Sequence, residues 1–218
     1  MKLADVYSGE YVLESERLLF RPIAYEDAPD MYEYCKDPDV SRYLLWTPHT
    51  SVGYTKRHIA WAIEGYREGR FFDFAVIEKV SRRMIGTCGF TSIDRENASA
   101  EIGYVFSKDY WGCGFGKEAI LTVLAFAFLS LSFHRVEARF MEENIASRRV
   151  AEKCGMTVEG YYRDKLYVKG GYRTIGVASI LKDEFISQNP YAVSSLRRAR
   201  EGDLPQSKKK GFFAFLFG

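Results

Sequence analysis

The sequence predicts a mixed α/β fold, in which a mostly antiparallel sheet of seven strands carries helices on both faces. Three strand-like segments follow one another between residues 71 and 106, as antiparallel hairpins do. Strand–helix–strand units then extend over residues 98–169, which is typical of crossover connections. The chain has 218 residues, of which 47% are hydrophobic, so it can bury a core without disulfides or a metal.

Turn residues set the boundaries of the elements in the first half of the chain. Pro38 and Gly69 are residue types that end helices, and each follows a helix-like run. The turn at residues 80–83 separates two apolar runs that read as paired strands. The elements expected here are a strand at 16–23, a helix at 25–35, an aromatic loop at 37–50, a helix at 51–68, and strands at 71–79 and 84–93.

The second half alternates strands and helices. Residues 98–106 and 134–141 each carry apolar side chains at every second position, which is the period of a half-buried strand. Asn144 is typical of a helix N-cap, and Gly155 is typical of the position after a helix end. The elements expected here are a strand at 98–106, a glycine-rich loop at 111–116, an apolar helix at 117–130, a strand at 134–141, a helix that ends at 154, and strands at 158–169 and 172–181.

We expect one domain with two appendages: an N-terminal extension (1–10), the domain itself (11–187) and a C-terminal tail (188–218). The net charge is +2, but six Lys or Arg against two Asp or Glu fall after residue 190. The body is therefore slightly acidic, which argues against nucleic-acid binding. No run approaches the roughly 20 apolar residues of a transmembrane helix, and the N-terminus lacks the apolar core of a secretory signal. These observations predict a cytoplasmic protein.

The C-terminal tail ends in three lysines and a Phe-rich segment (208–217). One interpretation is a flexible tail without a partner, because residues 201–207 are mostly polar. Lysines beside aromatic residues also favour weak contact with an anionic membrane surface. Docking of the same aromatic residues on the body or on a second copy is the third interpretation. A monomer and a homodimer both remain open.

Four cysteines lie far apart in the sequence, and none forms a Cys-x-x-Cys pair. They are Cys35, Cys88, Cys113 and Cys154. Metal sites need closely spaced pairs of ligands, so no metal site is expected. Free thiols in a reducing compartment are the expected state.

A glycine-rich loop precedes the apolar helix at 117–130. Gly112, Gly114 and Gly116 stand at alternate positions, so no Cβ keeps a ligand away from the backbone amides. The N-terminus of the helix adds partial positive charge. Together these features predict a phosphate or pyrophosphate site, with a connector that binds no ligand as the alternative.

Two known phosphate-binding patterns fit this loop poorly. A nucleotide-hydrolase loop needs Gly, four residues and Gly-Lys-Ser/Thr, but here Trp111 and Glu118 stand at the first and last positions. The dinucleotide pattern is matched literally by residues 114–119, and Glu137 lies near its expected acidic position. However, the loop does not leave its strand directly. A nucleotide-dependent oxidoreductase is therefore the weaker alternative.

Four segments taken together resemble the GCN5-related N-acetyltransferase (GNAT) family, in particular the branch with the ribosomal-protein alanine and serine N-acetyltransferases. They are Glu-Ile-Gly-Tyr-Val-Phe (101–106), Tyr-Trp-Gly-x-Gly-x-Gly-x-Glu-Ala (110–119), Arg-Val-Glu-Ala (135–138) and Asn-x-Ala-Ser-x-Arg-Val-x-Glu-Lys-x-Gly (144–155). The resemblance covers residues 11–185. It implies a GNAT-like sheet with a splayed central cleft that binds acetyl-CoA as cosubstrate.

The implied activity is acetyl transfer to a primary amine, either a protein or peptide N-terminus or a small molecule, by direct attack on the thioester. A CoA-binding regulatory or inactive member of the same fold is the alternative. The pyrophosphate would lie on the amides of 111–117 and the pantetheine along 104–106, where a backbone N–H would face the thioester oxygen. The residues implied for acetyl-CoA binding are Tyr104, Val105, Phe106, Trp111, Gly112, Cys113, Gly114, Phe115, Gly116, Lys117, Asn144 and Ser147.

The chain lacks a residue that many members of the wider family use for proton transfer. Many members place a Tyr acid just before Glu-Lys-x-Gly, where this chain has Ala151. By resemblance to the ribosomal-protein branch Ser147 is the candidate acid, and Glu101, in the strand that lines the cleft, is the candidate base or water-holding group. The structural alternatives are a plain N-cap for Asn144, a surface residue for Ser147 and a salt-bridged carboxylate for Glu101.

The acceptor side of the site departs from the branch as well. In the last hairpin, the branch commonly carries Asp and Tyr where this chain has Thr174 and Ala178, so a ribosomal substrate is not expected. Aromatic residues of the loop at 43–46 and of the helix at 51–68 would form this side of the site.

Overall fold

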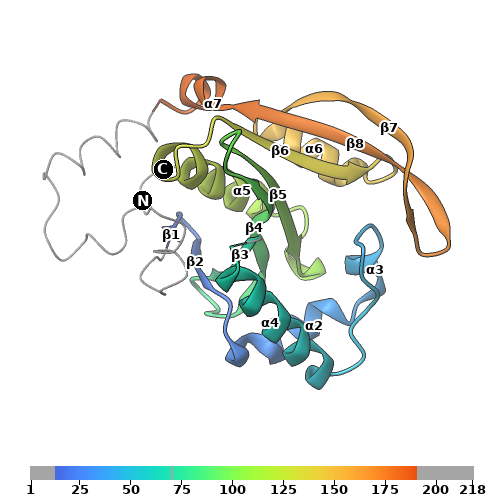
Figure 1. The fold of residues 1–218 in the computed structure, drawn as a ribbon. Helices are drawn as coiled ribbons and strands as arrows, with labels where there is room; N and C mark the ends of the chain where they lie inside the picture. Colours follow the sequence, from blue (N-terminus) through green and yellow to red (C-terminus); the bar gives the residue numbers. More distant parts are fainter. Residues whose placement is uncertain (1–12, 70, 191–218) are drawn as a thin grey trace, which may run out of the picture.

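Eight strands form one mixed sheet in the computed structural model, which describes residues 13–69 and 71–190 (Figure 1). The strand order is β1-β2-β3-β4-β5-β6-β8-β7. All neighbouring strands are antiparallel except β5 and β6, which are parallel. The predicted mixed, mostly antiparallel sheet is therefore confirmed, with one more strand than expected.

The elements follow the predicted order closely. The strands are β1 (Leu13–Glu14), β2 (Leu18–Pro22), β3 (Phe72–Glu78), β4 (Met84–Asp94), β5 (Ser99–Phe106), β6 (Arg135–Met141), β7 (Thr157–Val168) and β8 (Gly171–Leu181). The helices are η1 (Tyr25–Asp27), α2 (Ala28–Cys35), α3 (Pro38–Ser41), α4 (Val52–Arg67), η2 (Lys108–Tyr110), α5 (Phe115–Ala125), η3 (Phe126–Ser130), α6 (Ile145–Lys153) and α7 (Lys182–Gln188).

Besides the single turn η2, two short elements stand where none was predicted. The eighth strand, β1, has only two residues, too few for an alternating pattern to appear in the sequence. Helix α3 lies inside the expected loop at 37–50: the Asp37 carboxylate accepts a hydrogen bond from the Asp39 backbone N–H, and Pro38 presets the first turn.

Helix α7 also extends the fold beyond the expected last strand. Its Phe185 is fully buried, with its ring 5.3 Å from that of Phe128. The predicted extension at 1–10 and nearly all of the tail at 188–218, with its lysines and Phe residues, lie outside the described residues. The domain boundaries therefore stay predictions. Within the described ranges, no helix combines the length and apolar character needed to span a bilayer.

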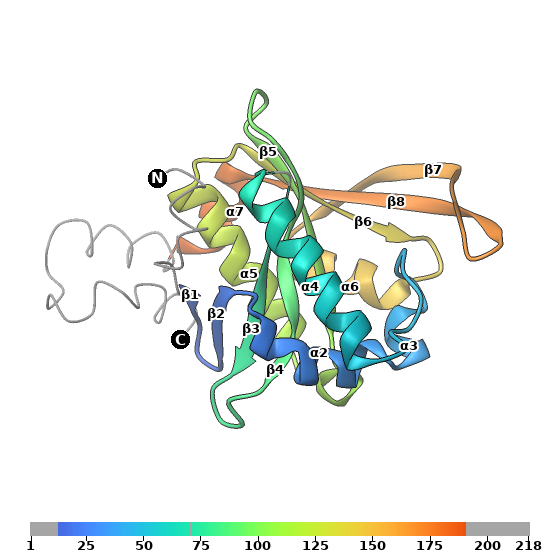
Figure 2. The same ribbon diagram turned by 60° about the horizontal axis from the view of Figure 1, so that its bottom comes forward.

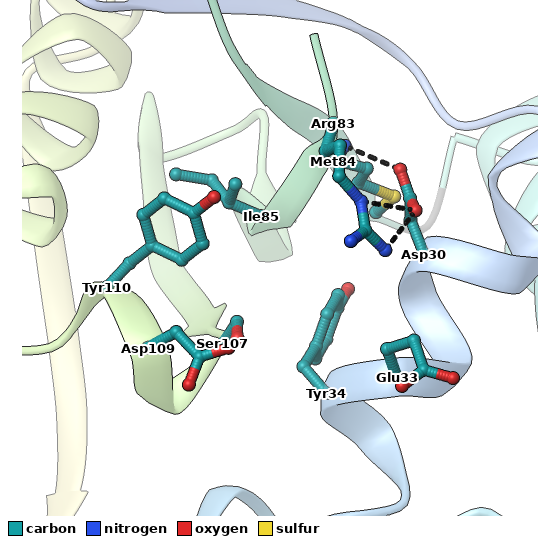
Figure 3. Close-up of a pocket in the computed structure, with 9 residues that line it drawn as sticks. All are labelled: Asp30, Glu33, Tyr34, Arg83, Met84, Ile85, Ser107, Asp109 and Tyr110. Atoms are coloured by element: carbon teal, nitrogen blue, oxygen red, sulfur yellow. Dashed lines mark hydrogen bonds and ion pairs between the residues drawn. The ribbon is translucent and has the colours of Figure 1, made fainter. Parts of the chain in front are cut away.

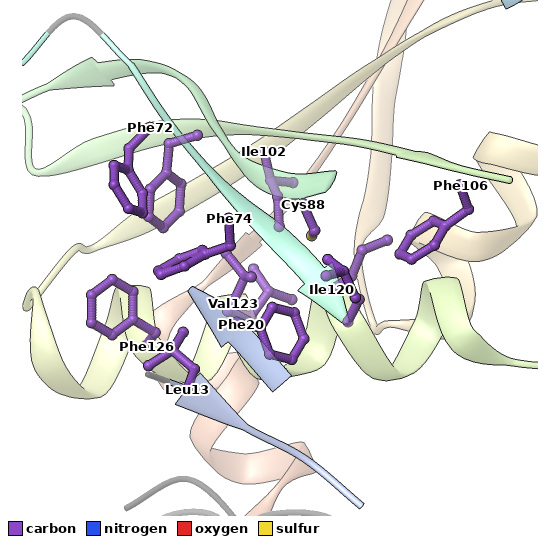
Figure 4. Close-up of a cluster of buried hydrophobic side chains, with 14 of the residues drawn as sticks. Leu13, Phe20, Phe72, Phe74, Cys88, Ile102, Phe106, Ile120, Val123 and Phe126 are labelled. Carbon is purple, nitrogen blue, oxygen red and sulfur yellow. The ribbon is translucent and has the colours of Figure 1, made fainter. Parts of the chain in front are cut away.

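Helices cover the two faces of the sheet (Figures 1 and 2). Helix α5 packs on one face of the sheet, and α2 and α4 pack on the other. Alternation along β3 sends Phe72 and Phe74 toward the α5 face, where Phe74 makes an edge contact with Phe126 at 5.7 Å (Figure 4). Asp73, between them, therefore faces α2 and α4.

The sheet opens between β5 and β6. The two strands pair over only three positions, from Ser99↔Arg135 to Glu101↔Glu137. Beyond Glu101, β5 continues along β4 and β6 continues along β8, and Figure 1 shows the two strands diverging. The expected splay is therefore present, and it leaves one edge of β5 open over residues 102–106.

Candidate active site

The open edge of β5 presents the backbone of two predicted cofactor residues. Ser107 N–H donates to the Ile85 carbonyl at 2.8 Å, and a Cβ at Gly86 would lie 2.2 Å from the Val105 carbonyl oxygen. The backbone groups of residues 105 and 107 therefore point toward β4. Because successive residues of a strand point opposite ways, Tyr104 and Phe106 present theirs to the open side. Val105, the third predicted residue of this strand, can contact a ligand at the open edge only through its side chain.

The glycine-rich loop ends at the N-terminus of α5. Gly114, with a φ of +84°, is the N-cap of this helix, and Gly112 has a φ of +76°. The helix begins at Phe115, two residues earlier than expected, and its first backbone bond runs from Glu118 N–H to the Gly114 carbonyl at 3.1 Å. The preceding amides have no partner inside the helix, and among the described residues the N-cap position supplies no side-chain cap. This arrangement suits an anion.

Arg17 and Glu118 hold this loop in place. Glu118 Oε1 accepts hydrogen bonds from the Arg17 backbone N–H (2.8 Å) and from Ser15 Oγ (2.7 Å), while its Oε2 pairs with Arg17 Nε (2.7 Å). Arg17 also donates to the Cys113 carbonyl at 3.0 Å, and its guanidinium lies 4.1 Å from the centre of the Phe115 ring. These charge-assisted bonds fix the loop before any ligand arrives.

Trp111 ties the start of the loop to the open edge. Its indole Nε1 donates to the Phe106 carbonyl at 2.9 Å, so that this carbonyl already has a partner. The predicted residues at 104–106 and at 111–117 are therefore brought together at one end of β5.

Ser147 meets a residue of the same strand. Asn144 Oδ1 accepts the Ser147 backbone N–H at 3.1 Å, so Asn144 is an N-cap, as its alternative interpretation held. Ser147 Oγ lies 2.9 Å from the Tyr104 hydroxyl oxygen. Burial raises the pKa of Tyr104 to about 12, so this phenol keeps its proton at neutral pH. The sequence placed both residues near the cofactor but did not indicate that they touch.

Glu101 lies at the closed end of the splay and on the other face of β5. Its Oε2 is 3.4 Å from Arg139 Nε, and Arg139 also pairs with Glu137 at 2.8 Å. These contacts match the interpretation as a salt-bridged carboxylate. The structure therefore does not bring the two predicted catalytic residues together, and the role of Glu101 in proton transfer stays a prediction.

A series of aromatic rings connects α4 to the loop before it. Ring centres lie 4.9–5.7 Å apart from Trp46 through His49, His58 and Trp61 to Phe71. His49 is buried, and burial lowers its pKa to about 4. Two of the α4 aromatic residues expected on the acceptor side, Tyr54 and Trp61, are exposed. The third, Tyr66, is buried in the core and cannot serve there.

A separate pocket lies between α2, the β3–β4 turn and η2 (Figure 3). Asp30 spans one side of it: its carboxylate pairs with Arg83 (2.7 Å) and accepts the Met84 backbone N–H (3.0 Å). These bonds anchor the β3–β4 turn to α2. No predicted site residue lines this pocket.

The cysteines are free thiols, with Cys113 exposed in the glycine-rich loop and the other three buried. Among the described residues, no three His, Cys, Asp or Glu side chains are grouped so as to hold a metal ion.

Comparison with known proteins agrees with this geometry. A family model described as an acetyltransferase (GNAT) domain matches residues 17–157. The uncharacterized N-acetyltransferase p20 of Bacillus licheniformis is 36% identical over 173 residues, which are 79% of this chain and 97% of that protein. The [ribosomal protein uS5]-alanine N-acetyltransferase of Escherichia coli is 24% identical over 74% of this chain and 86% of that protein.

Solved structures share the fold. A GNAT-family acetyltransferase from Bacillus anthracis aligns with a TM-score of 0.71 at 27% identity, over 79% of this chain and 99% of that one. A mostly antiparallel sheet also differs from the doubly wound parallel sheet that a dinucleotide oxidoreductase needs, so that alternative is wrong. The chain belongs to the GNAT family and is an acetyl-CoA-dependent N-acetyltransferase.

Proposed function

We propose that this enzyme acetylates α-amino groups and other amines of low pKa, with acetyl-CoA held along the open edge of β5. One observation carries the proposal: the unpaired edge at 102–106 ends beside the uncapped N-terminus of α5. An extended pantetheine arm on this edge leads directly to an anion site for the pyrophosphate. The residues of 104–106, 111–117 and the α6 N-terminus fit this donor.

In the proposed mechanism, the neutral amine attacks the carbonyl carbon of the thioester. An outward-facing N–H of Tyr104 or Phe106 stabilises the oxyanion that forms, typically a large electrostatic contribution. The intermediate collapses as the carbon–sulfur bond breaks, and Ser147 donates a proton to the leaving sulfur. The attacking nitrogen, which becomes positively charged, releases one proton to solvent, and Ser147 regains a proton from solvent.

The acceptor ranking follows from protonation. At pH 7 roughly a tenth of an α-amine of pKa near 8 is neutral, against less than a thousandth of a lysine side chain of pKa 10.4. We therefore expect peptide N-termini to be acetylated faster than lysine side chains. Thiol release with matched peptides, one with a free N-terminus and no lysine and one N-acetylated with a single lysine, measures the ratio. Faster reaction of the lysine peptide would contradict the ranking.

The β7–β8 hairpin bears on whether the acceptor is a ribosomal protein. The name of the E. coli relative gives an alanine of ribosomal protein uS5 as the acceptor. In this chain, Thr174 Oγ1 accepts the Asp164 backbone N–H (3.3 Å), and Ala178 is fully buried, so these positions hold the β7–β8 hairpin. A ribosomal acceptor is therefore not part of the proposal.

A CoA-binding regulatory member without turnover is the alternative that the sequence left open, because Ala151 stands where many members place a Tyr acid. Relatives named N-acetyltransferases, which match most of this chain, weigh against it. Acetyl-CoA would stabilise such a protein, but neither of the two peptides would release thiol.

We propose in addition that the protein works in the cytoplasm, where its four free thiols stay reduced, and that its basic tail binds weakly to anionic membranes. Co-sedimentation with anionic vesicles at low and high salt tests the tail, since a surface contact of this kind weakens with salt. A lack of binding at low salt would leave a tail without a partner or a tail docked on the body or on a second copy, and sedimentation of the intact protein then separates monomer from homodimer.

A further inference from the structure

Asp73 is a carboxylate on the acceptor side that sequence reasoning missed. It lies on β3, on the face covered by α2 and α4, and it is only partly buried. The strand register places it opposite Gly89 on β4, which in turn lies opposite Gly103 on β5. These three positions form a row across the sheet that ends at the open edge of β5.

Gly89 and Gly103 contribute no side chain of their own between Asp73 and that edge. A Cβ at Gly89 would lie 2.9 Å from Asp73 Oδ1, so the carboxylate occupies space that a larger residue would take. At Gly103 the position of a Cβ is approached only by the Thr91 methyl group, at 2.5 Å. Neighbouring strands lie about 4.8 Å apart, so two strand spacings, about 10 Å in all, separate Asp73 from Gly103, and a short chain of waters is needed to reach the open edge.

Asp73 is uncommitted, unlike the other carboxylates near the site. Within residues 13–69 and 71–190, its carboxylate accepts no hydrogen bond and forms no ion pair, whereas Glu101 is bound to Arg139 and Glu118 to Arg17. Burial raises the pKa of Asp73 to about 7, close to the pH at which a base must accept a proton.

The groups packed on this face do not neutralise the carboxylate. Tyr34 of α2 interacts electrostatically with Asp73, and with Cys35 of α2, Tyr66 of α4 and Asp27 of η1. Cys88 of β4, beside Gly89, interacts with Asp73 as well. None of these groups is a cation. Asp27 is itself bound to Arg21 of β2 at 2.5 and 2.7 Å, so that guanidinium is already committed. Neither β4 nor β5 adds a charge in the row itself, because both contribute glycine there.

We propose that Asp73 accepts the proton of the acceptor ammonium through bridging water. The N–H bond breaks and its electron pair stays on nitrogen, which then attacks the thioester carbon. The proton moves through water to an Asp73 oxygen and from there to solvent, and no other reactant is needed. The inference rests on the proposed function and extends it, because a base of this strength deprotonates an α-ammonium far more readily than a lysine side chain.

The test compares wild type, Asp73→Asn and Glu101→Gln by kcat/KM as a function of pH. For wild type we expect an inflection near pH 7. Asp73→Asn should lose that inflection and about tenfold in kcat/KM at pH 7, with unchanged acetyl-CoA affinity. Glu101→Gln should retain the inflection, whatever its effect on the rate. Glu96 is an exposed carboxylate on the β4–β5 turn, so Glu96→Gln is the matched control and should resemble wild type.

A second readout separates proton transfer from a structural role. O-methylhydroxylamine is already neutral at pH 7 and needs no base, so Asp73→Asn and wild type should acetylate it equally. The substrate amine adds its own inflection near pH 8 to every profile. A deficit of similar size with O-methylhydroxylamine and with the α-amine peptide, or an inflection near pH 7 that survives in Asp73→Asn, would overturn the inference while leaving the proposed function intact. A wild type that acetylates no amine would instead overturn the proposed function.

Thermal melts check that Asp73→Asn folds. The folded state holds a proton on Asp73 between pH 4 and 7 that the unfolded chain has released, so this carboxyl contributes less to stability as the pH rises through that window. The midpoint of Asp73→Asn relative to wild type should therefore rise from pH 4 to pH 8. A fall over the same range would show that Asp73 is stabilised as an anion, and it would overturn the inference.

Discussion

In Gly114→Val, we expect that acetyl-CoA no longer raises the unfolding midpoint, although the apo protein still folds. Gly114 has a φ of +84°, which a β-branched residue rarely adopts, and it is the N-cap of α5. A side chain there would point into the space that the pyrophosphate needs and would lie 3.4 Å from an Arg17 nitrogen. Wild type at 100 times its dissociation constant should gain about 2.7 kcal/mol from acetyl-CoA.

A matched variant separates backbone strain from the loss of the ligand. Gly170, in the β7–β8 turn, has a φ of +78° and no heavy atom within 4 Å of its Cβ position. Gly170→Val therefore carries similar strain away from the loop, and it should keep the full acetyl-CoA shift. Titration calorimetry checks the affinity directly. Wild-type affinity in Gly114→Val would remove the glycine-rich loop from the cofactor site.

The order of the elements was readable from the sequence because each rests on a local signal. Asn144 caps α6, and Gly155, with a φ of +85°, follows its end, as the residue types predict. The apolar alternation in 98–106 and 134–141 likewise gave β5 and β6 within one residue of their start. The short elements β1 and α3 were missed because two to four residues carry too little pattern to distinguish them from a loop.

The site was predictable only where its residues share a motif. Glu118 was part of a quoted motif, but nothing in the sequence indicated Arg17, whose partner is 101 residues away. Asp73 reads as an ordinary polar position in an apolar strand, and only the packing of α2 and α4 leaves it partly buried and without a partner. The splay itself was inferred from the family resemblance, because no local sequence pattern indicates where the pairing of β5 with β6 ends.

Ser147→Ala should lower turnover by more than tenfold while leaving acetyl-CoA affinity nearly unchanged, because the loss of a general acid acts on the transition state. The contact with Tyr104 sharpens this expectation. With a pKa of about 12, the phenol is the more acidic of the two hydroxyls and the better donor, so Ser147 Oγ accepts its hydrogen bond. The hydrogen of Ser147 itself is then left for the sulfur.

Tyr104→Phe should therefore lower kcat several-fold, because the Ser147 hydroxyl is then free to rotate. In a protein that already carries Ser147→Ala, Tyr104→Phe should not lower kcat further. A double-mutant cycle on kcat, with acetyl-CoA affinity measured alongside, tests this dependence. If the two losses multiply in the double variant, Tyr104 acts independently of Ser147. If Ser147→Ala weakens acetyl-CoA binding and leaves kcat intact, Ser147 is a binding residue and the proton reaches the sulfur from water alone.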